Sequence, residues 1–277
     1  MLNAAARGDA VSYETRSLMP TFEVPGAELA VALSDEGGHP VVQLHGLTSS
    51  RAHDRVLNLD LGRGLSGTRL LRYDARGHGR STGRKVPEDY QWQSLADDLL
   101  RLLDHWFPGE RVHGVGPSMG TGTLLHAASR EPDRFTGLTL MVPPTAWETR
   151  PAQAANYRVA AALIESDGVE AFLATTRGAT SPPATIGAPE TAPDVADAIL
   201  PSLLRGAALS DLPAPGAIAR IDVPTTILAW VGDPGHPLST AEFLAELLPQ
   251  ATLTVARTPK DVETWPNILS QDVARRG

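Results

Sequence analysis

The chain has no cysteine among its 277 residues. Disulfide bonds, thiolate nucleophiles and cysteine-based metal sites are therefore excluded. Long apolar runs are also missing, because none reaches the roughly 18 residues that a membrane-spanning helix needs. Residues 1–20 have neither the basic start nor the apolar centre of a signal peptide. We therefore expect a soluble, cytoplasmic protein that does not bind a membrane.

An excess of positive charge is absent as well. Lys and Arg number 24 against 32 Asp and Glu, which gives a formal charge of −8, and the arginines are dispersed along the chain. A nucleic-acid partner is therefore not expected. The sequence contains no metal-ligand cluster and no dinucleotide-binding glycine fingerprint, so no metal and no cofactor is expected either. The expected partner is a small-molecule substrate, and no pattern in the sequence indicates an oligomeric state.

The composition itself is that of a globular protein with a large core, since 42% of the residues are hydrophobic and 20% are charged. Short apolar runs alternate with amphipathic segments, and this alternation predicts βαβ units and a mostly parallel, doubly wound sheet. We expect a hairpin from 21–24 and 28–33, and then strands at 41–44, 69–73, 111–115, 138–142, 225–231 and 251–255. Helical patterns lie between the strands at 51–61, 95–103 and 121–130.

The alternation is interrupted between 144 and 215. Helical patterns at 153–165, 169–175 and 195–208 lie there, with a proline-rich stretch at 179–185 between them. We therefore divide the chain into an N-terminal arm (1–20), an α/β core (21–143 and 216–277) and an inserted helical cap (144–215). A cap is favoured because ligands bind at the carboxyl edge of such sheets, and an ordinary helical excursion is the alternative.

The most informative motif is Gly116-Pro117-Ser118-Met119-Gly120, which stands between a predicted strand and a predicted helix. A serine on a sharp strand-to-helix turn projects its hydroxyl into open space. The backbone two residues to either side then passes too close for a Cβ, and Gly116 and Gly120 relieve that crowding. The pentapeptide therefore indicates a nucleophile elbow centred on Ser118.

Two further motifs occupy the same predicted edge of the sheet. His45-Gly46-Leu47-Thr48 follows the strand at 41–44, where a loop can supply a backbone N–H to the oxyanion of an acyl-transfer intermediate. Gly46 allows that backbone to approach a substrate closely. A polar, glycine-rich turn at 74–81 follows the next strand. The order and spacing of the three motifs are more specific than any one of them.

With these motifs the chain resembles the α/β-hydrolase superfamily over about residues 21–273. The resemblance implies an α/β-hydrolase fold with Ser118 as the nucleophile and the backbone N–H groups of Leu47 and Met119 as the oxyanion hole. It implies that Asp233, just after the strand at 225–231, is the orienting carboxylate. A turn-forming aspartate is the alternative, since Asp-Pro and Pro-Gly favour turns. His45 and His78 are expected to be structural.

The chain departs from the family pattern in the position of the catalytic base. The family places a histidine in the loop after the last strand, and here residues 256–261 contain none. His236 is the leading replacement because it preserves the order serine, acid, histidine. A histidine bonded only to backbone is the alternative reading of His236. His53 is a lesser candidate for the base, and Lys260 a remote one.

These observations predict a serine hydrolase that acts on an ester, lactone or thioester of a small, largely apolar substrate through an acyl-enzyme. Two alternatives remain open because of the missing C-terminal histidine. One is a non-hydrolytic lyase or cyclase of specialised metabolism. The other is a catalytically inactive member that binds a small molecule.

Overall fold

A computed structural model describes residues 20–177 and 181–275 of the chain. Apart from Pro20, the predicted N-terminal arm lies outside the described residues. The strands form one eight-stranded sheet in the order β1-β2-β4-β3-β5-β6-β7-β8. Strands β3 to β8 run parallel, and β1 and β2 run antiparallel to their neighbours. The strands are β1 (Thr21–Val24), β2 (Ala27–Asp35), β3 (His39–Gln43), β4 (Thr68–Tyr73), β5 (Val112–Pro117), β6 (Phe135–Met141), β7 (Thr225–Trp230) and β8 (Ala251–Ala256).

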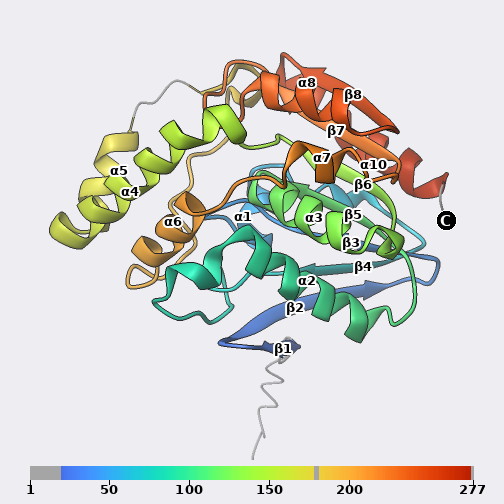
Figure 1. The fold of residues 1–277 in the computed structure, drawn as a ribbon, viewed down its shortest axis with the longest axis horizontal. Coiled ribbons are helices and arrows are strands. Elements are labelled where there is room, and N and C mark those ends of the chain that lie inside the picture. Colours follow the sequence, from blue (N-terminus) through green and yellow to red (C-terminus); the bar gives the residue numbers. More distant parts are fainter. Residues whose placement is uncertain (1–19, 178–180, 276–277) are drawn as a thin grey trace, which may run out of the picture.

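Helices cover both faces of this sheet, as Figure 1 shows. One hydrophobic cluster joins the sheet to α2, α3, α7 and α8, and a second joins it to α10 on the opposite face. The predicted doubly wound α/β-hydrolase fold is confirmed. The helices are α1 (Arg51–Val56), α2 (Trp92–Trp106), α3 (Met119–Arg130), α4 (Arg150–Asp167), α5 (Val169–Thr176), α6 (Leu200–Ala208), α7 (Pro215–Ile218), α8 (Leu238–Leu247), α9 (Pro259–Val262) and α10 (Trp265–Ala274).

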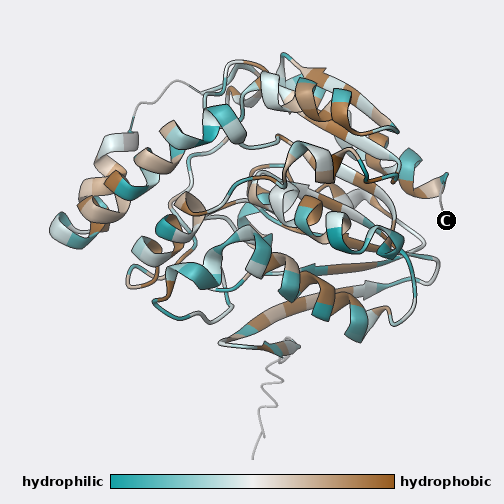
Figure 2. Ribbon diagram, viewed as in Figure 1, coloured by the Kyte–Doolittle hydropathy of each residue, from teal (hydrophilic) through white to brown (hydrophobic). Residues whose placement is uncertain are grey.

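The central strands are apolar because both of their faces are covered. Every residue of β5 and of β7 is buried, and brown, hydrophobic strands pass through the middle of the molecule in Figure 2. A strand with helices on both sides has no polar face, so it appears in the sequence as a continuous apolar run. None of the helices in the described ranges is long and apolar enough to cross a membrane.

Two predicted helices are shorter than their sequence patterns suggest. The helix expected over 51–61 ends at Val56, because Asn58 adopts a left-handed φ of 59° and the chain continues into a 3₁₀ helix at Leu61–Gly64. The helix expected over 195–208 begins at Leu200. Val195 instead forms an isolated β-bridge with His78, and a turn at 197–199 leads into the helix.

Helices α4, α5 and α6 form an insertion between β6 and β7. They lie together beside the carboxyl ends of the parallel strands, on the left of Figure 1. The insertion has a small hydrophobic cluster of its own, made of Ala161, Ile164, Leu200 and Leu204. The cap boundaries 144 and 215, and the lid role, stay predictions.

Candidate active site

Ser118 lies on the sharp turn between β5 and α3. Its backbone has φ 51° and ψ −108°, which L-residues rarely adopt. Main-chain bonds hold this conformation: the Ser118 N–H donates to the Met141 carbonyl at 2.9 Å, and the Gly122 N–H donates to the Ser118 carbonyl at 3.0 Å. The Thr121 hydroxyl lies within hydrogen-bonding distance of the carbonyls of Gly116 and Met141, at 2.9 and 3.0 Å. Ser118 thus occupies a strained position that its neighbours stabilise.

The two glycines of the motif are required by crowding around this turn. A Cβ on Gly116 would lie 3.0 Å from the Leu44 Cβ and 3.2 Å from the Gly120 Cα. A Cβ on Gly120 would lie 3.0 Å from the Leu44 Cβ and 3.2 Å from the His45 carbonyl oxygen. A larger residue at either position would therefore push the elbow away from Leu44 and His45, which follow β3.

His236 reaches Ser118 directly. Its Nε2 lies 2.8 Å from the Ser118 Oγ, and its Nδ1 lies 2.8 Å from the Asp233 Oδ2. A carboxylate can only accept, so Nδ1 carries the proton and Nε2 is free to accept from the serine hydroxyl. The His236 side chain is 25% exposed and that of Asp233 is 16% exposed, so a small molecule can approach the pair. The arrangement suits the expected roles of a nucleophile, a base and an orienting carboxylate.

A β-turn explains how a histidine only three residues from Asp233 can bond to it. The His236 N–H donates to the Asp233 carbonyl at 3.2 Å, and the Gly235 N–H donates to the Asp233 Oδ1 at 2.9 Å. Pro234 is the residue type favoured after the first position of such a turn. The Thr145 N–H, in the segment that follows β6, donates to the Gly235 carbonyl at 3.1 Å. This bond holds the turn against that segment. The turn thus folds the imidazole back between its own carboxylate and Ser118.

Asp233 is held in its ionised form. Burial raises its pKa, but hydrogen bonds from His236, from the Trp230 indole and from the Gly235 N–H outweigh burial and lower the pKa to about 2. The Trp230 Nε1 donates to Asp233 Oδ2 at 2.9 Å, the same oxygen that accepts from His236. Trp230 could not be recognised from the sequence, because a tryptophan at the end of a buried strand has no pattern that separates it from core packing.

His45 orients the loop that follows it, residues 46–50, which we call the oxyanion loop after the role expected of it from the sequence. The Ala75 N–H donates to the His45 Nε2 at 2.8 Å, so the proton lies on Nδ1, which donates to the Gly46 carbonyl at 2.8 Å. Because a trans peptide is planar, this bond turns the following N–H, that of Leu47, to the opposite side. A Cβ on Gly46 would face the Ser118 Cβ at 3.9 Å, so the loop passes directly over the serine.

The Leu47 and Met119 N–H groups make no hydrogen bond to another group in the described part of the chain. The Met119 N–H belongs to the first turn of α3, where backbone donors have no partner within the helix. Two free donors beside Ser118 suit an anionic oxygen. His45 and His78 contribute to packing: burial lowers the pKa of both, to about 3 for His78, and their rings meet edge-on at 4.9 Å.

The other candidates for the base lie elsewhere. The His53 Nε2 is 4.0 Å from the Asp194 Oδ2, and Lys260 lies in the first turn of α9 with its side chain exposed. The loop after β8 holds a helix cap, in which the Asp261 carboxylate accepts from the N–H groups of Arg257 and Thr258. Across residues 20–177 and 181–275, no three His, Asp or Glu side chains gather as a metal site.

Known proteins show the same sequence pattern and fold. Residues 39–163 match the family model of the alpha/beta hydrolase fold. RutD of Pseudomonas syringae pv. syringae, named as a carbamate hydrolase, is 31% identical over 195 residues, which cover 67% of this chain and 73% of that protein. The 3-oxoadipate enol-lactonase 1 of Acinetobacter baylyi is 28% identical over 193 residues, covering 64% of this chain and 66% of that one.

A solved structure extends the likeness to nearly the whole chain. A hydrolase from Pseudomonas aeruginosa PA01 superimposes with a TM-score of 0.74 at 24% identity, covering 94% of this chain and 98% of that one. At this level of identity the likeness concerns the fold. Together with the sequence relatives and the strand order, it confirms the resemblance drawn from the motifs. The chain belongs to the α/β-hydrolase superfamily.

Proposed function

We propose that this enzyme is a serine hydrolase that cleaves an ester, lactone or thioester of a small, largely apolar substrate through an acyl-enzyme. One observation carries the proposal: the His236 imidazole lies 2.8 Å from both the Ser118 hydroxyl and the Asp233 carboxylate. A serine hydroxyl is a weak nucleophile without a base, and this contact supplies the base.

Acylation follows from these contacts. The Ser118 Oγ attacks the carbonyl carbon of the substrate while the His236 Nε2 takes the hydroxyl proton. Asp233 keeps the proton on Nδ1 and stabilises the imidazolium. The negative charge moves to the carbonyl oxygen, where the N–H groups of Leu47 and Met119 stabilise it. When the tetrahedral intermediate collapses, His236 passes its proton to the leaving alcohol, thiol or lactone hydroxyl.

Deacylation repeats the sequence with water as the nucleophile. His236 removes a proton from the water as the water oxygen attacks the acyl carbon. The second tetrahedral intermediate releases the carboxylic acid, and the proton returns from His236 to the Ser118 oxygen. Each step uses the same base and the same two backbone donors.

The substrate class rests on the insertion and on the relatives. Leu47 packs against the insertion's cluster together with Tyr157 and Phe172, so apolar groups border the oxyanion loop. We propose that the insertion is the cap over the site, which suits a small, largely apolar substrate. The names of the relatives, carbamate hydrolase and enol-lactonase, denote hydrolysis at an acyl carbon. That chemistry is also what the serine, histidine and two N–H groups can perform.

The alternatives have less support. A lyase, a cyclase or an inactive binding protein was suggested by the empty histidine position after the last strand. His236 lies in the loop after β7 and contacts the Ser118 hydroxyl as a base would. A base therefore does not require a histidine in the loop after β8. The observation that motivated those alternatives is therefore accounted for.

The test combines covalent labelling with substitution. We expect a fluorophosphonate probe to label Ser118, and Ser118→Ala to abolish both labelling and hydrolysis of p-nitrophenyl acetate. His236→Ala is expected to lower kcat by about 10³-fold or more, because the serine loses its base. His105→Ala is the matched control, because His105 is an exposed histidine in the last turn of α2, and it is expected to leave kcat unchanged. Retained hydrolysis in Ser118→Ala contradicts the proposal, and so does product formed without oxygen from labelled water.

A further inference from the structure

The oxyanion loop is attached to the insertion through one residue that no sequence pattern singles out. We propose that Asp194, in the segment before α6, is a positioning residue whose carboxylate is needed to fix residues 46–50 so that the Leu47 N–H points at the reacting oxygen. The inference rests on the proposed function and names a further residue on which that function depends. It also makes the geometry of the oxyanion hole depend on the insertion.

The main chain of Asp194 lies between two loops at the carboxyl edge of the sheet. Its N–H donates to the Thr48 carbonyl at 2.8 Å, and its own carbonyl accepts from the Gly79 N–H at 2.7 Å. Thr48 belongs to the oxyanion loop, and Gly79 belongs to the turn after β4. One peptide segment of the insertion therefore bridges two loops that lie far apart in the sequence.

The Asp194 side chain adds a third attachment. The Ser50 Oγ donates to the Asp194 Oδ2 at 2.5 Å, and the same Oγ accepts from the N–H groups of Ala52 and His53 at 3.2 Å each. Ser50 is the N-cap of α1. Because its proton points to Asp194, its lone pairs are directed at the helix N–H groups. The carboxylate thus fixes both the end of the loop and the start of α1.

The oxyanion loop needs such support because it is strained. Thr48 has a φ of 59°, an uncommon conformation for a β-branched residue. The loop follows β3 and lies outside the ladder bonds of the sheet. A strained conformation persists only where the surroundings fix it. The bond from the Asp194 N–H to the Thr48 carbonyl acts one residue beyond Leu47, whose N–H is the proposed oxyanion donor.

Apolar packing couples the same elements. Val195 forms a β-bridge with His78, and Leu47 and Val195 both pack against the insertion's cluster. The side chain of Leu47 thus contacts the insertion, and the carbonyl of the next residue, Thr48, accepts from the N–H of Asp194. Displacing the insertion would therefore remove support from the Leu47 N–H, whereas Ser118, His236 and Asp233 are held by the core.

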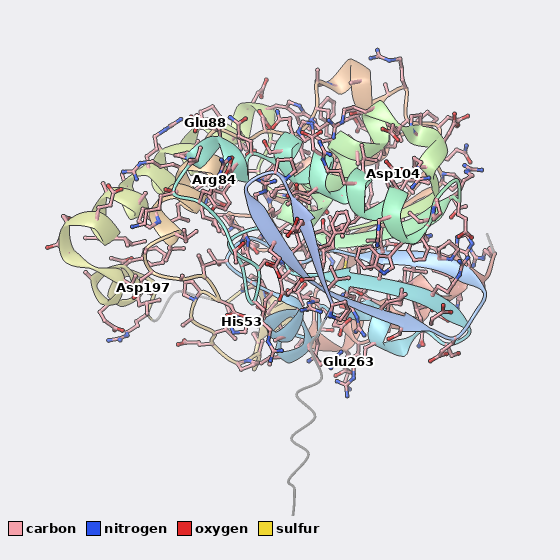
Figure 3. All side chains as sticks on the ribbon, turned by 90° about the horizontal axis from the view of Figure 1, so that it is seen from below. His53, Arg84, Glu88, Asp104, Asp197 and Glu263 are labelled. Carbon is pink, nitrogen blue, oxygen red and sulfur yellow. The ribbon has the colours of Figure 1, made fainter. Side chains whose placement is uncertain are left out.

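The experiment compares Asp194→Asn and Asp194→Ala with Asp197→Asn. Asp197 is an exposed aspartate of the same segment, which in Figure 3 lies on the insertion and apart from His53 of α1. Asparagine still accepts a weaker bond from Ser50, whereas alanine accepts none. With p-nitrophenyl acetate we expect kcat to fall about threefold for Asp194→Asn and about tenfold for Asp194→Ala, with KM within about twofold of the wild-type value. Asp197→Asn is expected to match the wild type.

A transition-state analogue separates positioning from general stability. A trifluoromethyl ketone adds to Ser118 and forms a tetrahedral oxyanion, so its affinity should fall by the same factor as kcat. Unchanged kcat and ketone affinity in Asp194→Ala overturn the inference. The inference is also overturned if Asp194→Ala lowers the melting temperature or kcat but leaves the affinity for the ketone unchanged. If Ser118→Ala keeps its activity, the proposed function itself fails, so the two failures are distinguishable.

Discussion

Two aspartates near the site, Asp233 partly buried and Asp54 buried, have pKa values shifted in opposite directions because they accept different numbers of hydrogen bonds. Asp233 accepts from His236, Trp230 and Gly235, and its pKa is lowered to about 2. Asp54 in α1 accepts from the Ser49 hydroxyl at 2.6 Å, and its Oδ2 is buried without a partner. Burial raises the pKa of Asp54 from 3.8 to about 7, helped by the charges of Asp60 and Asp74. Donors therefore outweigh burial at one residue and not at the other.

The first prediction at this scale concerns Trp230. Trp230→Phe keeps an aromatic ring to stack on Trp265, at 5.9 Å between centroids, but removes the N–H donated to Asp233. Since Asp233 then holds His236 less firmly, kcat should fall about three- to tenfold. Trp265→Phe is the control, because the Trp265 Nε1 is buried without a partner. Steady-state kinetics decide the matter, and equal kcat values for the two variants would contradict the expected role of Trp230.

The second prediction concerns Asp54 and pH. The folded pKa of about 7 lies above the ordinary value of 3.8. Between about pH 4 and pH 7 the folded protein therefore holds a proton that the unfolded chain has released, so stability falls as the pH rises through this window. Asp54→Asn removes this dependence, and its stability relative to wild type should rise by a few kcal/mol from pH 4 to pH 8. Urea unfolding at several pH values measures it, with Asp197→Asn as the control; a pH-independent difference would speak against the raised pKa.

At the scale of elements, the acid and the base share one loop. The β-turn from Asp233 to His236 lies between β7 and α8, and β7 is separated from β5, the strand before Ser118, by β6 alone. The Asp-Pro-Gly-His sequence predicted a turn from local preferences. It did not predict that the turn would face the elbow, because that depends on which strands are neighbours. The loop after β8, which contains no histidine, forms a helix cap.

Arg150 joins segments of the insertion to one another and also contacts the core. Its guanidinium is buried and donates to the carbonyls of Thr145, Ala207 and Ser210, of which Ala207 lies in the last turn of α6 and Ser210 just after that helix. It also lies 4.4 Å above the Trp92 ring. The cation therefore interacts with the negative end of a helix dipole and with an aromatic face.

We accordingly predict that Arg150→Met lowers the free energy of unfolding by about 2–4 kcal/mol, because it leaves buried carbonyls without donors. Arg158→Met is the matched control, since Arg158 is exposed and contacts the Ala208 carbonyl at a long 3.4 Å. It should change the unfolding free energy by less than about 0.5 kcal/mol. Chemical denaturation of both variants provides the comparison. Equal losses of unfolding free energy in the two variants would contradict the predicted role of Arg150.

At the scale of the whole molecule, the apolar core has two large parts and a small one. The large clusters cover the two faces of the sheet, and the small cluster lies within the insertion. Leu125 of α3 is fully buried in the first cluster, and Ile164 of α4 belongs to the small one. A small satellite cluster contributes less to global stability and opens more easily.

We therefore predict that Leu125→Ala lowers the global free energy of unfolding by about 2–5 kcal/mol. Ile164→Ala should lower it by less, while increasing amide exchange across α4, α5 and α6. Urea unfolding and hydrogen exchange measured by mass spectrometry test both expectations. Exchange that rises equally in the core and the insertion in Ile164→Ala would mean that the two unfold as one unit.

The sequence by itself determined the fold class, the elbow conformation of Ser118 and the order of the motifs. Each of these follows from local chemistry: glycines where a Cβ would clash, apolar runs where both faces of a strand are covered, and turn residues between them. It also named Asp233 and His236, whose catalytic roles stay predictions. Only the tertiary structure decided which histidine reaches the serine, because Ser118 and His236 are 118 residues apart and meet through the strand order. The contacts of Asp194 were hidden for the same reason, since hydrogen bonds between distant loops leave no periodic pattern in a sequence. Trp230 lies only three residues from Asp233 and was hidden because a tryptophan in a buried strand cannot be distinguished from core packing.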